Sequence, residues 1–190
     1  MVKFIDFKRK VLPYNREHYI EFLDDDFIPN NGWNALSFSI KSKANSLIQS
    51  LELLELFLKN AIIALDSGNN FIINHDDKDM KWFIYEENNL PSLRTLFKRN
   101  NIQNTFKGYL ICKKNDLFDI TNDIVSYPYI LSYKNLDISH ENLPFIIKIT
   151  DHLTIDLLST DKILLNEIKN KCFNDSFNII EYRGSQSGIL

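Results

Sequence analysis

The stretch that decides the fold is SLIQSLELLELFLKNAIIALDSG, residues 46–68. Ser46, followed three residues later by Gln49, forms a capping box, which marks the first turn of a helix. Leucine and isoleucine then recur at intervals of three and four residues, and Gly68 follows the last of them as a stop signal. The sequence therefore predicts one long helix over about residues 46–66.

The apolar residues of this helix occupy most of its circumference, because Ile48, Leu53, Leu56, Phe57 and Ile63 add to the face that the leucine repeat defines. A helix that is apolar on several sides is expected to be buried. We therefore expect it to be the buried central helix of the fold, packed on two sides.

The clearest hairpin signal lies over residues 145–158. Apolar residues alternate along 145–150 and again along 153–158, with Asp151 and His152 between the two arms. This pattern predicts two antiparallel strands, and because Asp-His is not a favoured two-residue turn pair, a longer or bulged loop is an alternative to a tight turn.

Strands are expected both in hairpins and singly between helices, which predicts an α+β fold with a mainly antiparallel sheet packed against the long helix and shorter helices. Further strands are expected over residues 3–7, 35–40, 71–74, 81–85, 106–113, 129–133 and 177–182. Further helices are expected over residues 15–23, 91–98, 116–125 and 161–172.

Length and composition indicate one globular domain. The chain has 190 residues, 44% of them hydrophobic and 25% charged, which is too apolar for a disordered protein. It contains no internal repeat and no linker rich in Gly, Pro or Ser. We therefore expect a single α+β domain over residues 1–183 and a flexible tail over 184–190.

The sequence predicts a cytoplasmic protein with no membrane partner. The most apolar run, residues 47–65, is interrupted by charges that would be unfavourable in lipid, and the N-terminus has no apolar signal region. Cys112 and Cys172 lie in apolar surroundings, so we expect two buried thiols, and neither belongs to a Cys-x-x-Cys pair that would indicate zinc.

Charge is segregated along the chain although the net charge is only −3. Residues 17–90 hold thirteen acidic against five basic side chains, and residues 91–114 hold six basic and no acidic ones. Such a protein coats nucleic acid poorly as a whole but can present a local acidic or basic face.

Two acidic clusters are the candidate partner-binding residues. They lie at residues 24–26 and 76–79, and neither fits an EF-hand, because the required Gly and Glu are out of register. The simpler interpretation is that each cluster is a solvated loop. The functional interpretation is that both loops contact a basic partner. The expected contact residues are Asp24, Asp25, Asp26, Asp76, Asp77 and Asp79.

The best acid–base set is His152 with Asp151 and Asp156. General acid–base chemistry needs a histidine and a carboxylate that orients it. If one strand covers both, His152 and Asp156 point to the same face, but a turn at residues 151–152 would separate them. His18 and His140 are expected at the surface and not as ligands.

Residues 94–114 combine cations with aromatic residues, as nucleic-acid readers do. The alternative is that Phe97, Phe106 and Tyr109 belong to the core while the cations are solvated. Trp33 and Trp82 are likewise expected in the core or as loop anchors.

The function that the sequence favours is a protein-binding inhibitor that neutralises a basic toxin or nuclease, of the kind that the immunity proteins of bacterial toxin systems represent. Acidic loops would speed its encounter with a basic target. We expect no catalytic residues, no metal and no cofactor. Two alternatives stay open, namely a small hydrolase or nuclease that uses His152 and Asp156, and a nucleic-acid-binding regulator that uses segment 94–114.

Overall fold

The computed structural model describes residues 2–6, 33–41, 46–65, 68, 70–75, 80–84, 89–131 and 135–183. The strands are β1 (Lys3–Asp6), β2 (Asn34–Ile40), β3 (Phe71–His75), β4 (Gly108–Cys112), β5 (Leu136–His140), β6 (Phe145–Ile149), β7 (Thr154–Ser159) and β8 (Phe177–Arg183). The helices are α2 (Leu47–Leu65), α3 (Pro91–Arg99), α4 (Lys114–Phe118), α5 (Thr121–Leu131) and α6 (Lys162–Cys172).

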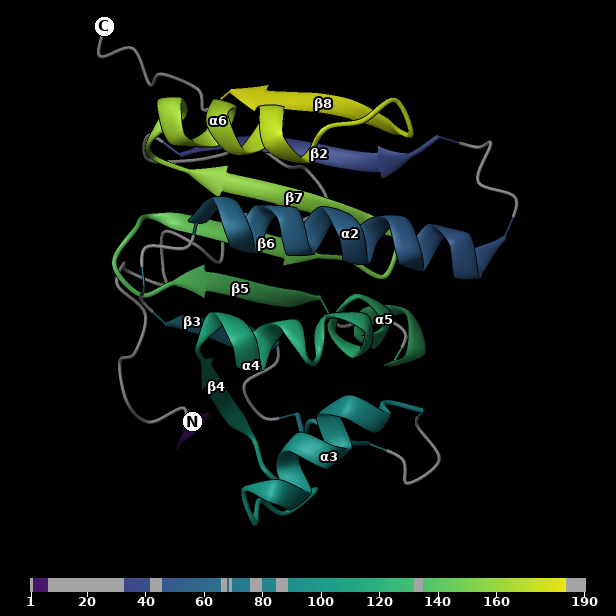
Figure 1. Cartoon of the computed structure of the whole chain (residues 1–190), viewed down its shortest axis with the longest axis vertical. Coiled ribbons are helices and arrows are strands. Elements are labelled where there is room, and N and C mark those ends of the chain that lie inside the picture. Colours follow the sequence, from purple (N-terminus) through teal and green to yellow (C-terminus); the bar gives the residue numbers. More distant parts are fainter. Residues whose placement is uncertain are drawn as a thin grey trace, which may run out of the picture.

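The eight strands form one sheet in the order β1-β4-β3-β5-β6-β7-β2-β8, and every neighbouring pair is antiparallel (Figure 1). Long connections carry the helices, so strands distant in sequence, such as β2 and β8, become neighbours. The predicted α+β class with an antiparallel sheet is confirmed. The boundary at residue 183 stays a prediction, because residues 184–190 lie outside the described part.

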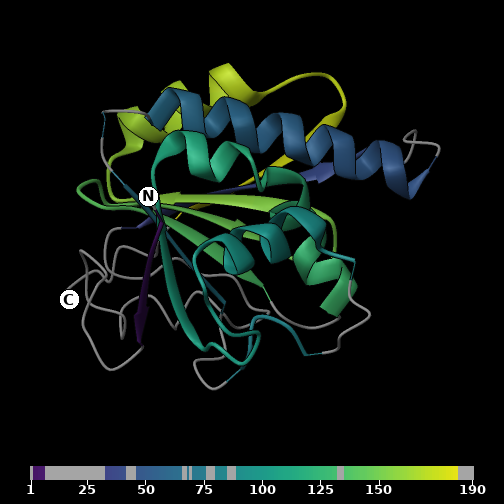
Figure 2. The ribbon, with the colours of Figure 1, turned by 60° about the horizontal axis from the view of Figure 1, so that its bottom comes forward.

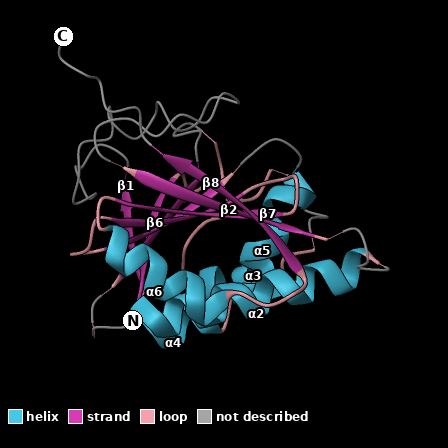
Figure 3. Cartoon of the chain, turned by 90° about the horizontal axis from the view of Figure 1, so that it is seen from above, coloured by secondary structure: helices cyan, strands magenta, loops and turns pink. Residues whose placement is uncertain are grey.

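The helices α2, α4 and α6 lie on one side of the sheet (Figure 3). Helix α5 packs beside α2, and α3 packs beside α5 towards the β4 end of the molecule (Figure 2). The strands send alternate side chains into the core under these helices, such as Leu36 and Phe38 from β2 or Ile155 and Leu157 from β7. The residues between them point to the opposite face of the sheet.

Helix α2 begins where the capping box places it, since the hydroxyl of Ser46 accepts a hydrogen bond from the backbone N–H of Gln49 at 3.2 Å. The side towards the sheet is buried, and α5 and α6 flank it. Ile48, Leu56 and Ile63 are exposed, however. The expectation that these three residues are packed is therefore wrong, because no described element covers the outer side of α2.

The predicted hairpin is present as β6 and β7. The chain turns through residues 151–153, and Leu153 adopts a left-handed backbone conformation with φ of 58°, as in three-residue hairpin loops. The following helix α6 is capped by Asp161, whose carboxylate accepts from the backbone N–H groups of Ile163 and Leu164.

The expected hairpin between residues 71–74 and 81–85 is absent. Strand β3 pairs instead with β4 and β5, and residues 80–84 form no strand. Trp82 is fully buried, and its indole N–H donates to the carbonyl of Gly108 at 2.9 Å. An aromatic residue that anchors a loop carries the same apolar signal as one in a strand, which explains the error.

Residues 114–140 also differ from the prediction. The single helix expected over 116–125 is two helices, α4 and α5, and α5 takes in Tyr129, where a strand was expected. Strand β5 was not predicted, because Asp137, Ser139 and His140 made it too polar to stand out.

Candidate functional site

The predicted partner-binding carboxylates lie outside the described residues, so that prediction stands untested; they are Asp24, Asp25, Asp26, Asp76, Asp77 and Asp79. His18 lies outside them too. The described residues offer three other features that could act on a partner or ligand: an exposed helix face, a buried polar line across the sheet and a shallow pocket.

The exposed helix face runs along α2. Its members are spaced four, four, three and four residues apart, which places them on one side of a helix. We call this set the α2 stripe, and it consists of Ile48, Glu52, Leu56, Lys59 and Ile63. Ile48, Leu56 and Ile63 are 69%, 51% and 53% exposed. At a rise of about 1.5 Å per residue, the stripe is roughly 22 Å long.

The two charged residues of the α2 stripe, Glu52 and Lys59, differ in their surroundings. Lys59 forms an ion pair with Glu55 at 2.7 Å, one turn away, and Glu55 also accepts a hydrogen bond from the hydroxyl of Thr121 on α5 at 2.9 Å. The positive charge of Lys59 is therefore compensated within the helix, and Glu52 gives the stripe an acidic character between its apolar side chains.

A line of polar side chains crosses the sheet on the face that points away from α2 and α6. Each of five strands contributes one residue, and strand register places each member directly opposite the next. We call this line the polar row, in the order Asn74, Asp137, Lys148, Asp156 and Ser37. Directly opposite side chains have Cβ atoms about 4.5–5.5 Å apart, so the Cβ atom of Lys148 lies between those of Asp137 and Asp156.

The polar row is almost completely buried. Asp137, Lys148 and Asp156 are 0%, 2% and 4% exposed. Burial raises the pKa of Asp156, while the hydroxyl of Ser37 and the charge of Lys148 act in the opposite direction. The amide of Asn74 is buried with no hydrogen-bond partner in the described part of the chain. A buried row of this kind can hold a proton or balance buried charge. Because its side chains are almost fully buried, a protein partner cannot contact them.

The sequence did not single out Asn74, Asp137 or Lys148. The available signal was one charge near the centre of an otherwise apolar strand, as in FIIKI of β6 and in TIDLLS of β7. A lone charge of this kind predicts that neighbouring strands supply its counter-charge, since an unpaired buried charge is costly.

The predicted acid–base set is not assembled. His152 lies in the hairpin loop with an 82% exposed side chain, and its nearest carboxylate is Asp151 at 3.7 Å. Asp156 is buried in the sheet beside Ser37 and Lys148. The turn at residues 151–152 therefore separates His152 from Asp156.

Two other histidines are buried, so the expectation that His140 lies at the surface is wrong. Its Nδ1 accepts from the backbone N–H groups of Asn142 and Leu143 at 3.1 and 3.0 Å, which shapes the turn between β5 and β6. His75 is fully buried, with its ring 5.0 Å from that of Trp82. Both histidines belong to the packed interior.

The aromatic residues of segment 94–114 belong to the core. Phe97 and Tyr109 are buried, and Phe106 is partly buried against the core. Trp33 is buried as well. Segment 94–114 therefore presents exposed cations, such as Lys98, without exposed rings for stacking on bases.

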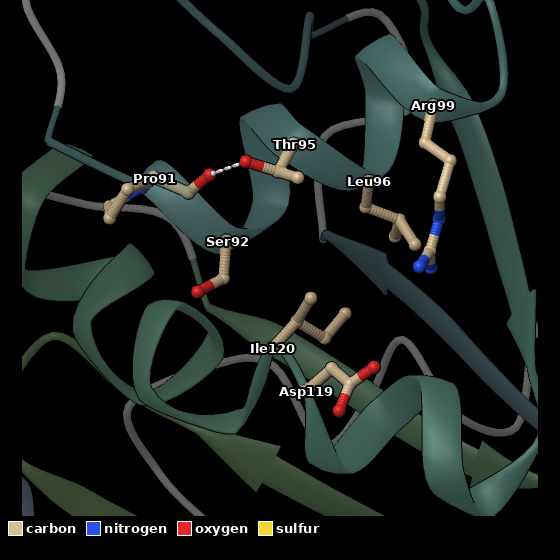
Figure 4. A pocket seen from close by; sticks show the side chains of 7 residues that line it. All are labelled: Pro91, Ser92, Thr95, Leu96, Arg99, Asp119 and Ile120. Atoms are coloured by element: carbon tan, nitrogen blue, oxygen red, sulfur yellow. Dashed lines mark hydrogen bonds between the residues drawn. The ribbon is translucent and has the colours of Figure 1, made fainter.

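A shallow pocket of about 260 Å³ lies between α3 and the start of α5 (Figure 4). Leu96 and Ile120 form its apolar part, and Arg99 and Asp119 supply one charge of each sign. A guanidinium nitrogen of Arg99 lies 3.9 Å from a carboxylate oxygen of Asp116. The lining holds a single carboxylate and no histidine or cysteine, so it offers no acid–base pair.

The described residues contain no group of three or more His, Cys, Asp or Glu side chains that could hold a metal ion. Among the described helices, none is long and apolar enough to cross a bilayer. Comparison of the chain with protein-family models, with curated proteins and with solved structures gives no significant match.

Proposed function

We propose that this protein is a binding inhibitor of the immunity, or antitoxin-like, type, which neutralises a cognate basic toxin or nuclease by contact through the α2 stripe. It acts by binding and not by catalysis. The observation that carries the proposal is the exposure of Ile48, Leu56 and Ile63 along one side of a helix whose other side is fixed in the core.

Single exposed apolar residues are common on protein surfaces, but three in line on one long helix are a recognised mode of binding to a groove. Their spacing of eight and seven residues matches the anchors of a helix that docks on a partner. Because α2 is already folded and held by the sheet, binding needs little ordering of the backbone, and a larger share of the burial energy remains as affinity.

A basic partner is favoured by charge. Glu52 lies between Ile48 and Leu56 in the stripe, and the acidic clusters expected at residues 24–26 and 76–79 add negative charge to the chain. Acidic groups around an apolar strip raise the rate of encounter with a basic surface and fix its orientation.

The two alternatives have weaker support. A hydrolase or nuclease would need His152 and Asp156 in one pocket, whereas one is exposed in a loop and the other is buried in the sheet. A nucleic-acid-binding regulator would have to rely on the cations of segment 94–114 alone, since Phe97 and Tyr109 are buried.

The proposal is tested with a stripe variant, Leu56→Ser with Ile63→Ser, and a matched control, Ile163→Ser. Ile163 is 74% exposed on α6, outside the stripe, and has the same chemistry. Each tagged protein is incubated with lysate of the source organism, and captured proteins are identified by mass spectrometry. The affinity of the purified partner is then measured for all three proteins.

We expect one stoichiometric basic partner that the wild type and the control capture equally and that the stripe variant binds at least about tenfold more weakly. A partner that binds all three proteins equally would exclude the α2 stripe as the contact. Capture of nucleic acid in place of a protein would favour the regulator. Neutralising Asp24, Asp25 and Asp26 together should slow association with the same partner, with little change in its dissociation rate.

A further inference from the structure

The two edges of the sheet differ in how well they are protected from pairing with another strand. Strand β1, at one edge, has only four residues and begins with an exposed lysine, Lys3. Short edge strands and edge lysines are the usual means by which proteins prevent edge-to-edge association. This edge is therefore protected.

Strand β8, at the other edge, lacks these features. It has seven residues, FNIIEYR, with no proline and no lysine, and it pairs with β2 in an unbroken register along its whole length. Ile180, at its centre, is 51% exposed. The Glu181 carboxylate is held by the Lys169 ammonium at 2.6 Å. A long, regular edge strand of this kind is a template for a further strand.

The sequence of β8 is compatible with antiparallel pairing to itself. A two-fold axis at Ile180 uses all seven residues and places Ile180 opposite Ile180 of a second copy. Ile179 then lies opposite Glu181, and Phe177 opposite Arg183, so no two like charges face each other. Directly opposite residues in an antiparallel pair lie on the same face of the sheet, so the two residues of each pair are cross-strand neighbours.

The helices leave room for this pairing. Helix α6 lies over β2 and β8 (Figure 1), and the Lys169 ammonium on it contacts the Glu181 carboxylate of β8 at 2.6 Å. With strands about 4.8 Å apart, the α6 helices of two copies would lie side by side at roughly 10–14 Å, which is no closer than the distance of about 8–10 Å at which helices pack. Two sheets can therefore join without a clash between helices.

We infer that β8 is a self-association edge, at which two copies of this chain form a symmetric dimer with one continuous sheet. The dimer is independent of the proposed inhibitor function, because β8 and the outer side of α2 are separate surfaces. Its centre is Ile180, and its recognition consists of backbone hydrogen bonds together with the contact between the two isoleucines.

The test is a pair of cysteine variants of the full chain under mild oxidation. Opposite residues in an antiparallel pair have Cα atoms about 4.5–5.5 Å apart, within the range of a disulfide. Ile180→Cys should therefore form a covalent dimer. Asn178→Cys is the matched control, because four residues, or about 14 Å, separate the two copies of position 178 in this register. Burial raises the pKa of both native thiols, Cys112 and Cys172, to about 12, so they compete little.

The mass of the untreated protein is measured in parallel by light scattering over a wide range of concentrations. We expect a dimer whose affinity falls by at least about tenfold in Ile180→Lys and is unchanged in Ile163→Lys, which adds the same charge on α6. A wild-type monomer at every concentration would overturn the inference. So would equal cross-linking at positions 178 and 180, or a dimer that Ile180→Lys leaves intact.

Discussion

Replacing Lys148 by methionine should destabilise the protein more than any surface substitution. Lys148 is 2% exposed, it lies opposite Asp137 and Asp156 in register, and its charge lowers the pKa of Asp156 against the effect of burial. Methionine fills a similar volume but leaves two buried carboxylates without that positive charge. Removing one partner from a buried ionic group costs about 3–5 kcal/mol.

The repulsion between Asp137 and Asp156 is the same in both proteins, so the loss is the attraction that Lys148 provides. Each carboxylate lies one strand spacing from Lys148, or about 5 Å. At an effective dielectric constant of about 20, two opposite charges at that distance attract by about 3.3 kcal/mol. The desolvation of the buried ammonium offsets part of that attraction. A loss of 3–5 kcal/mol is a large part of the 5–15 kcal/mol that is typical of a domain.

The assay is urea denaturation followed by tryptophan fluorescence and circular dichroism, with Lys107→Met as the control because Lys107 is exposed. The deficit of Lys148→Met should shrink as the pH falls, because burial raises the pKa of Asp156 and that carboxylate gains a proton. A loss below about 1 kcal/mol at neutral pH, or a deficit that grows in acid, would refute the view that the polar row balances buried charge.

Three further substitutions test other buried groups. Tyr127→Phe should leave the free energy of unfolding unchanged or raise it by about 1 kcal/mol in urea denaturation, because the buried hydroxyl has no hydrogen-bond partner in the described part of the chain. Asp123→Ala should lower that free energy by about 1–2 kcal/mol, because the Asp123 carboxylate accepts from the backbone N–H of Leu93 at 2.8 Å and caps α3; Asp123→Asn, which keeps an acceptor oxygen, should lose less. The pKa of Asp156 is raised above 3.8 by burial, so its stabilising contribution is fully present below pH 3.8 and is lost as the pH rises through the folded value. Asp156→Asn should flatten the dependence of unfolding free energy on pH in that interval, and an unchanged slope would contradict this assignment.

Elements with a local chemical signal were predictable from the sequence. The start of α2 depends on Ser46 and Gln49, and the start of α6 depends on Asp161, which accepts from two backbone N–H groups of its own first turn. The β6–β7 hairpin has its register set by a short loop. In each case the residues that decide the structure lie within a few positions of one another.

Strand pairing across the sheet was not predictable, because distant residues decide it. Strand β3 was expected to pair with residues 81–85, its neighbours in sequence, but it lies between β4 and β5. Trp82 carries the apolar signal of a strand while serving as a loop anchor against Gly108. Local periodicity does not distinguish these roles.

The polar row shows the same limit for a candidate site. Lys148 was an isolated charge in its strand, and its counter-charges come from β5 and β7, eleven and eight residues away in the chain. Only the register of the assembled sheet makes the three residues one group. Helix α2 shows the reverse case, because helical spacing alone separates Leu54, which belongs to the leucine repeat and is buried, from Leu56, which lies outside the repeat and is exposed.

The two proposed contacts together have a geometric consequence. A two-fold axis that relates antiparallel edge strands runs perpendicular to the sheet, so both copies place α2 on the same face. A dimer joined at β8 would therefore carry both α2 stripes on the same face of one continuous sheet, turned relative to each other by the twist of that sheet. A partner with two binding sites could then engage both stripes at once, and avidity would exceed the affinity of one stripe. Ile180→Lys would abolish that gain and leave the affinity for a single site unchanged, whereas Leu56→Ser would lower both. The two substitutions therefore separate the contribution of the dimer from that of the stripe.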